Sequence, residues 1–143
     1  MQLTRFSDIS LRLLLLLASR DAASPTVTAR ATADSFAVPY THMVKVVHLL
    51  GRNGLIFTTK GKGGGLRLGR PAHSIRIGDV LRMTEPDKAV IDCFTQPCPL
   101  RFECLLKQAL DDALEAFYSH LDKFTLSDLA TMPGLKALIQ IEN

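Results

Sequence analysis

The residues whose types and spacing could do chemistry are three cysteines in the second half of the chain, Cys93, Cys98 and Cys104. Thiolates bind zinc and iron-sulfur clusters, so this group points to a metal centre. We expect Cys93 and Cys98 in a proline-rich loop that can fold around one centre, because buried structural cysteines usually follow helix or strand periodicity. Free thiols and a zinc site are the alternatives. Zinc usually takes tighter cysteine pairs and four closed ligands, and three thiolates leave the fourth ligand to come from elsewhere.

A catalytic role for these thiols is not expected. A nucleophilic cysteine needs an activating base, and the local sequence suggests no histidine and acid partner for Cys98 or Cys104. Three cysteines also cannot all pair, and a disulfide framework is rare in a reducing compartment. We therefore expect metal ligands or redox thiols in a protein that is not an enzyme.

Charge is distributed unevenly along the 143 residues of the chain. Residues 1–82 carry 12 lysines and arginines against 4 acidic residues, whereas residues 83–143 carry 5 against 10. A basic first half followed by an acidic second half suggests that the first half meets a polyanion. Double-stranded DNA is the partner that we expect.

Three helices are expected in the basic half, over about 7–19, 26–36 and 40–52, with Ser7 or Asp8 opening the first. The second and third are joined by a short turn that ends in a proline, a residue suited to the first position of a helix. Two short helices joined in this way outline a helix-turn-helix. The core side of the first helix is expected to carry Ile9, Leu13, Leu16 and Leu17.

The third of these helices is the expected recognition helix, because the N-terminal end of that helix meets base edges in helix-turn-helix proteins. The residues expected to face the core are Val44, Val47 and Leu50. The residues expected to project towards DNA are Tyr40, Thr41, His42 and Lys45.

A glycine-rich segment after the third helix predicts a β-hairpin, or wing. Residues 55–60 and 66–68 have strand character and flank residues 61–65, which include four glycines. A nucleotide-binding Walker loop is disfavoured, because Leu66 opens a strand and not a helix. The wing cations expected to reach phosphates or the minor groove are Lys60, Lys62 and Arg67.

The acidic half is expected to continue with a short helix over 77–83, a loop over 85–102 and a long helix from about Glu103. The apolar arc of the long helix is too wide for one domain to cover, so a second copy of the chain is the simplest partner. Its members include Leu106, Leu110, Ala113, Phe117, Leu121 and Phe124. Thr125 has the character of an N-cap for a last short helix.

These elements predict a mostly α-helical fold with a small β-hairpin wing, that is, a winged helix-turn-helix followed by a long dimerisation helix. We assign residues 1–84 to the DNA-binding domain, 85–104 to the cysteine-bearing loop, and 103–143 to the dimerisation helix and C-terminal tail. The apolar run 13–18 is too short to cross a bilayer, and Asp8 argues against a signal peptide. We therefore expect a cytoplasmic homodimer that does not enter a membrane.

Five features spread over nearly the whole chain also carry a family resemblance. They are the segments 1–8, 42–45, 60–69 and 75–80, and the spacing of the three cysteines. Each is common by itself, but together they resemble NsrR, the nitric-oxide-sensing repressor of the winged-helix family that also contains the iron-sulfur cluster regulator IscR.

The resemblance implies an iron-sulfur cluster, with 4Fe-4S favoured over 2Fe-2S, bound by Cys93, Cys98 and Cys104. IscR-type members have a histidine three residues after the third cysteine, where this chain has Lys107. That departure favours NsrR within the family. The implied function is repression, from an inverted-repeat operator, of genes for nitric oxide detoxification while the cluster is intact. The alternatives are a regulator that responds to cluster supply or oxidants, and a winged-helix protein with structural zinc.

The resemblance also implies a fourth ligand for the cluster. Asp8 matches an N-terminal aspartate that completes a 4Fe-4S site from the partner subunit. The alternative role of Asp8 is a favourable charge near a helix N-terminus, or an ion pair with Arg12 four residues later.

Overall fold

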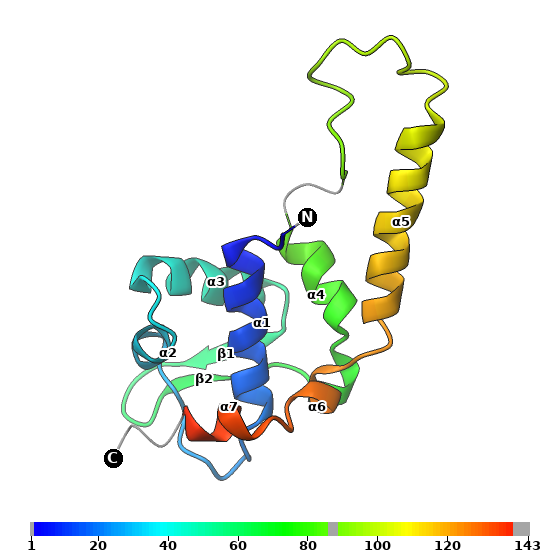
Figure 1. The fold of residues 1–143 in the computed structure, drawn as a ribbon. Coiled ribbons are helices and arrows are strands. Elements are labelled where there is room, and N and C mark those ends of the chain that lie inside the picture. The colour runs from blue at the N-terminus through cyan, green and yellow to red at the C-terminus, as the bar shows by residue number, and fades with distance from the viewer. Residues whose placement is uncertain (1, 86–88, 139–143) are drawn as a thin grey trace.

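The computed structural model describes residues 2–85 and 89–138. It contains a two-stranded antiparallel hairpin and otherwise helices, which confirms the expected fold class. In chain order the elements are α1 (Arg5–Ala18), α2 (Ala29–Ser35), α3 (Tyr40–Arg52), β1 (Ile56–Thr59), β2 (Gly65–Leu68), a 3-10 turn η1 (Ala72–Ser74), α4 (Ile77–Thr84), α5 (Leu105–Leu121), α6 (Leu126–Leu129) and α7 (Pro133–Ala137). In Figure 1, α5 lies alongside α4 and extends away from the winged body, with the cysteine-bearing loop at its far end.

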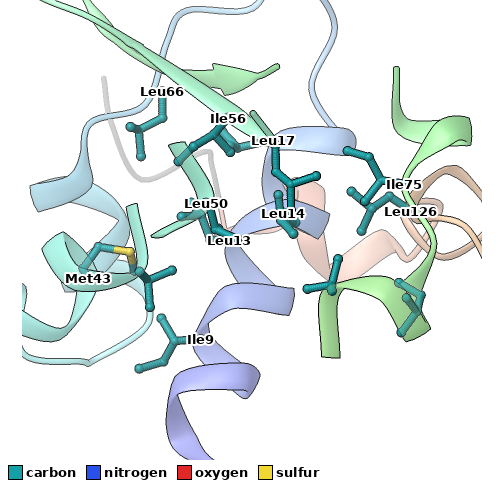
Figure 2. Close-up of a cluster of buried hydrophobic side chains, with 14 of the residues drawn as sticks. Ile9, Leu13, Leu14, Leu17, Met43, Leu50, Ile56, Leu66, Ile75 and Leu126 are labelled. Carbon is teal, nitrogen blue, oxygen red and sulfur yellow. The ribbon is translucent and has the colours of Figure 1, made fainter. Parts of the chain in front are cut away.

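Helix α1 is the centre of the core. The expected inward residues Ile9, Leu13, Leu16 and Leu17 are all buried. Ile9, Leu13 and Leu17 belong to one core cluster with side chains from α3, the wing and α6 (Figure 2). Burying one such side chain stabilises the fold by about 1.5–3 kcal/mol. The helix begins earlier than predicted, because Thr4 and not Ser7 or Asp8 is its N-cap. Ser7 is instead fully buried, and its hydroxyl donates to Thr84 Oγ1 at 2.8 Å.

The helix-turn-helix differs from expectation in two details. Helix α2 begins at Ala29 with Thr28 as its N-cap, so the predicted start at Thr26 was wrong. The preceding Val27 is extended and pairs with Leu66 of the wing. Helix α3 has the predicted bounds, but it buries Met43, Val46 and Leu50. Of the predicted inward residues, Leu50 is buried and Val47 is half-buried against the core, which confirms both, whereas Val44 is exposed and its prediction was wrong.

The wing pairs β1 with β2 in the register Ile56↔Leu68 to Thr59↔Gly65. It is fastened to the segment before α2, where Thr26 Oγ1 donates to the Gly64 carbonyl at 2.7 Å and the Leu66 N–H donates to the Val27 carbonyl at 2.7 Å. Gly65 permits this close approach, because a Cβ atom there would lie 2.7 Å from the Val27 carbonyl oxygen. The wing is therefore held at its base by the helix-turn-helix.

Helix α5 begins at Leu105 and ends at Leu121, so Phe124 lies beyond the helix in which it was predicted. Its most buried residue is Tyr118, while Leu105 is 80% and Leu106 62% exposed. Among the described residues, the exposed side of α5 that carries Leu105 and Leu106 therefore has no apolar partner. Thr125 caps α6 with a reciprocal capping box, as expected. Within the described residues, no helix is long and apolar enough to span a membrane.

Candidate DNA-binding face and metal-binding loop

The N-terminal half of α3 carries the four residues predicted to face DNA, and all of them are exposed. They are Tyr40, Thr41, His42 and Lys45. The exposed side of α3 follows from the burial of Met43 and Val46 on the opposite side. This arrangement suits a recognition helix, because short polar and cationic side chains project from the end that enters a major groove.

The wing adds two exposed cations, Lys60 and Lys62, beside its glycine turn. In the part of the chain that the structure describes, no carboxylate lies within ion-pairing distance of Lys45, Lys60 or Lys62. Unneutralised cations on neighbouring elements create a positive field that attracts a polyanion. The predicted DNA-facing cations of α3 and the wing thus remain available to phosphates.

Arg67 occupies a different position from the two wing lysines. It is half-buried, and its guanidinium donates to the carbonyls of Ala22 at 3.3 Å and Ser24 at 3.2 Å. These bonds hold the loop between α1 and α2 against β2. Sequence analysis did not detect this role, since the partners are backbone groups far away in the chain. A DNA contact by Arg67 stays a prediction.

The three cysteines are free thiols in and next to the loop between α4 and α5. Cys93 is buried, Cys98 exposed and Cys104 half-buried. Asp92 turns the loop by accepting hydrogen bonds from the N–H groups of Phe94 at 2.9 Å and Thr95 at 3.1 Å. These bonds and the one from the Thr95 hydroxyl, which is the strongest influence, lower the pKa of Asp92. Cys93 therefore lies in a loop segment that has its own internal hydrogen bonds.

Cys104 is the N-cap of α5. Its Sγ accepts a hydrogen bond from the Lys107 N–H at 3.4 Å. The Lys107 side chain pairs with Asp111. The hydrogen bond to Asp111 raises the pKa of Lys107 most, and Coulombic interactions with Cys93 and Cys104 act in the same direction. Two of the three cysteines thus lie near the first turn of α5.

The donor chemistry of this loop fits an iron-sulfur cluster, because three thiols are available and an amide already donates to one sulfur. Within residues 2–85 and 89–138, however, no three His, Cys, Asp or Glu side chains are close enough to hold a metal ion. The loop would have to bring its sulfurs together around the cluster. The ligand roles of Cys93, Cys98 and Cys104 remain predictions.

Asp8 lies in the first turn of α1, where it forms the ion pair that sequence analysis gave as its alternative role. Its Oδ1 lies 2.8 Å from Arg12 Nε, and both side chains are largely exposed. The start of α1 is bound to the end of α4, since the Thr4 N–H donates to Glu85 Oε1 at 3.0 Å. Asp8 therefore sits near the point where the cysteine-bearing loop begins. Ligation by Asp8 of the partner subunit stays a prediction.

The junction of α4 and α5 holds a charged cluster that sequence analysis missed. Arg82 donates to both oxygens of Asp122, each at 2.9 Å, and to Glu115 at 3.3 Å. Its guanidinium lies 5.0 Å from the centre of the Tyr118 ring. These interactions raise the pKa of Arg82 and lower that of Asp122, chiefly through their mutual hydrogen bonds. The cluster fastens the base of α5 to the winged body.

A family model described as Rrf2, iron-dependent transcriptional regulator, matches residues 3–132. The chain belongs to the Rrf2 family. Members of this family are transcription regulators, which are generally not enzymes. The match covers the helix-turn-helix, the wing, the cysteine-bearing loop and α5.

Solved structures share the Rrf2 fold along nearly the whole chain. The global cysteine regulator CymR of B. subtilis is 22% identical, with a TM-score of 0.71 over 92% of this chain and 97% of that one. An oxidized form of CymR from Staphylococcus aureus is 24% identical, with a TM-score of 0.73 over 92% and 98%. IscR of T. potens is 17% identical, with a TM-score of 0.70 over 100% and 92%. These similarities confirm the winged-helix architecture of an Rrf2 regulator.

Proposed function

We propose that this Rrf2 chain is a cytoplasmic, homodimeric repressor that binds an inverted-repeat operator and senses nitric oxide through an iron-sulfur cluster. The observation that carries DNA binding is the exposed face formed by α3 and the wing. Its cations, Lys45, Lys60 and Lys62, have no carboxylate partner among the described residues. Salt-dependent affinity for a phosphate backbone follows from such a surface.

The uncovered side of α5 supports the homodimer. Leu105, Leu106, Ala109 and Ala113 are exposed along this helix. An apolar helix side of this kind is stabilised by packing against a second helix with the same pattern. A dimer would also provide the two recognition helices that an inverted repeat requires.

The cysteine-bearing loop supports the sensor. Cys93, Cys98 and Cys104 would hold the cluster, the Lys107 N–H would donate to the Cys104 sulfur, and Asp8 of the partner subunit is the candidate fourth ligand. When bound, the cluster would supply the iron at which nitric oxide is detected. Because a carboxylate holds iron less firmly than a thiolate does, Asp8 would make the cluster more reactive than four thiolates would.

The connectivity of the chain links this loop to DNA binding. The loop joins α4, in the winged body, to α5, which is expected to form the dimer. A change in the loop would alter the direction of α5 and therefore the spacing of the two α3 helices. A shift of about 3 kcal/mol between two dimer states changes DNA affinity by roughly a hundredfold.

Anaerobic purification of the full chain tests the cluster and the signal together. We expect visible absorption with iron and sulfide in near-equal amounts, and tight binding to a duplex selected from a random-sequence pool. Nitric oxide should weaken that binding by about a hundredfold. Loss of binding on cluster depletion or oxidation but not with nitric oxide would indicate a sensor of cluster supply or oxidants. Colourless protein with stoichiometric zinc would exclude the cluster.

A pair of variants tests the fourth ligand. Asp8→Ala and Arg12→Ala both remove the ion pair at the start of α1, but only the first removes the carboxylate. We expect Asp8→Ala to change the visible spectrum of the cluster and its rate of loss in air, while Arg12→Ala resembles the parent. Equal behaviour of the two variants would remove Asp8 from the ligand set.

A further inference from the structure

A groove of about 370 Å³ lies between α3 and the wing, on the face that carries the unpaired cations. Its walls include Tyr40, Val44 and Val47 from α3 and Thr58, Thr59 and Leu66 from the wing. The α3 side is apolar because the helix turns Met43 rather than Val44 into the core. Val44 is 41% exposed and Tyr40 39% exposed, so both present apolar surface to an occupant.

Arg30 of α2 stacks on the tyrosine of this groove. Its guanidinium carbon lies 3.8 Å from the centre of the Tyr40 ring. Asp34 lies one helical turn further along α2, at the spacing of a helical ion pair. Nevertheless, no carboxylate among residues 2–85 and 89–138 lies within ion-pairing distance of Arg30. A guanidinium stacked on a ring keeps its edge available for paired hydrogen bonds to a phosphate.

The chemistry around the groove is complementary to a nucleic-acid backbone. Its wall has hydroxyl groups from Thr58 and Thr59, and Lys60 lies between two lining residues of the wing. A sugar-phosphate strand has an apolar sugar face and a charged phosphate at each step. Hydroxyls and cations bind phosphate oxygens, while the aliphatic surface of Val44 suits a deoxyribose. An apolar peptide would leave the surrounding cations without partners.

We propose that this groove receives the sugar-phosphate backbone of one DNA strand, and that Arg30, positioned by the Tyr40 ring, binds one of its phosphates. The proposal rests on the DNA-binding function proposed above and adds to it a residue outside the recognition helix and the wing. It also gives Tyr40 a positioning role, since the ring would hold the guanidinium in place whether or not its hydroxyl touches DNA.

The salt dependence of DNA binding by the anaerobically purified full chain tests this assignment. Arg30→Ala should weaken binding about tenfold and reduce the slope of log K against log salt by about 0.9. Arg30→Lys, which keeps the charge, should restore the slope but only part of the affinity. Tyr40→Phe should resemble the parent, whereas Tyr40→Leu should weaken binding by less than Arg30→Ala. Lys123→Ala removes an exposed cation of the acidic half and is the matched control.

The same measurements on single-base variants of the selected duplex separate a phosphate contact from a base contact. A loss that is uniform across these duplexes supports the proposal, and a loss confined to one base position overturns it in favour of base recognition by Arg30. If Lys62→Ala reduces the salt slope but Arg30→Ala behaves like Lys123→Ala, the groove assignment is wrong while the proposed function stands. Absence of salt-dependent DNA binding by the parent protein would overturn both.

Discussion

Two regions of the molecule differ in whether their cationic side chains are paired with carboxylates. At the junction of α4 and α5, Arg82 is held by Asp122 and Glu115 and stacks over Tyr118. On the face formed by α3 and the wing, Lys45 and Lys62 have no carboxylate within ion-pairing distance among the described residues. The difference distinguishes cations that stabilise the fold through ion pairs from cations that are available to bind a polyanion. Each kind of position should respond differently to substitution.

The largest loss of stability is expected from Gly78→Ala, where α4 packs against the C-terminal end of α5. A Cβ atom there would lie 2.1 Å from Asp122 Oδ1 and 2.7 Å from the Tyr118 carbonyl oxygen. Relieving that overlap would displace Asp122 from Arg82. We expect the free energy of unfolding to fall by about 2 kcal/mol, despite the higher helix propensity of alanine.

The matched control for this change is Gly51→Ala in α3, where the nearest atom to an added Cβ is 3.9 Å away. This variant should be neutral or up to about 1 kcal/mol more stable than the parent. Urea unfolding followed by circular dichroism measures both. Equal changes in the free energy of unfolding for the two variants would show that α4 does not pack closely against α5 at Gly78.

Arg82→Met should have the next largest effect. It keeps an apolar stem over Tyr118 but removes the bonds to Asp122 and Glu115. The side chains of Arg82 and Asp122 are 30% and 24% exposed, so solvent screens part of the interaction. We expect a loss of about 1–2 kcal/mol in the same unfolding measurement. Arg12→Met, which removes the exposed pair with Asp8, should leave the unfolding midpoint unchanged.

The same pair predicts a pH dependence. Arg82 lowers the pKa of Asp122 in the folded protein, while the unfolded chain keeps an ordinary aspartate value of about 3.9. The stabilisation is therefore complete above that ordinary value and is lost as the pH falls through the lower folded pKa. The parent protein should lose more stability between pH 5 and pH 3 than the Arg82→Met variant does. Thermal unfolding of both proteins across that pH range measures the difference. Parallel losses would indicate that other carboxylates dominate the acid transition.

Arg67→Met tests the boundary between the two classes of cation, because Arg67 is on the wing but is bonded to backbone carbonyls. Loss of those bonds should reduce stability by about 0.5–1 kcal/mol. DNA binding should weaken mainly through the displaced loop, with a smaller change in salt slope than Lys62→Met produces. A full change in slope with unaltered stability would instead place Arg67 among the phosphate contacts.

Lys62→Met should change stability least. The residue is exposed and has no ion pair among the described residues, so thermal unfolding should match the parent within error. Its salt slope for DNA binding should nevertheless fall by about 0.9. A destabilised Lys62→Met protein would contradict the distinction between fold-maintaining and partner-binding cations.

Local signals predicted the order of elements and several of their ends. The proline before Tyr40 marked the start of α3 correctly, and Thr125 caps α6 as its sequence context indicated. On the inward side of α3, Leu50 and Val47 were predicted correctly, but Val44 was placed in the core where the structure has Met43. Met43 and Val44 are both apolar, and only packing against α1 and the wing determines which of them is buried.

Features that depend on distant partners could not be predicted in the same way. Val27 is β-branched, which could have indicated an extended residue, but its pairing partner Leu66 is far away in the sequence, on strand β2 of the wing. Arg82 sits on α4 and has a local ion-pair partner in Asp79, but its hydrogen-bonded carboxylates lie on or just after α5, at separations of 33 and 40 residues. The spacing of Cys93, Cys98 and Cys104 indicated a metal centre, but the positions of the sulfurs depend on a loop conformation that spacing does not specify.

The one-sided attachment of α5 has a mechanical consequence. The helix has 17 residues, so it is about 25 Å long, and Arg82 and Tyr118 fasten it near its C-terminal end. It would therefore act as a lever whose fulcrum lies at the α4–α5 junction and whose opposite end carries Cys104. A displacement of about 2 Å at that end corresponds to a rotation of about 5° at the fulcrum. A small movement of the cysteine-bearing loop would reach the winged body as a rotation.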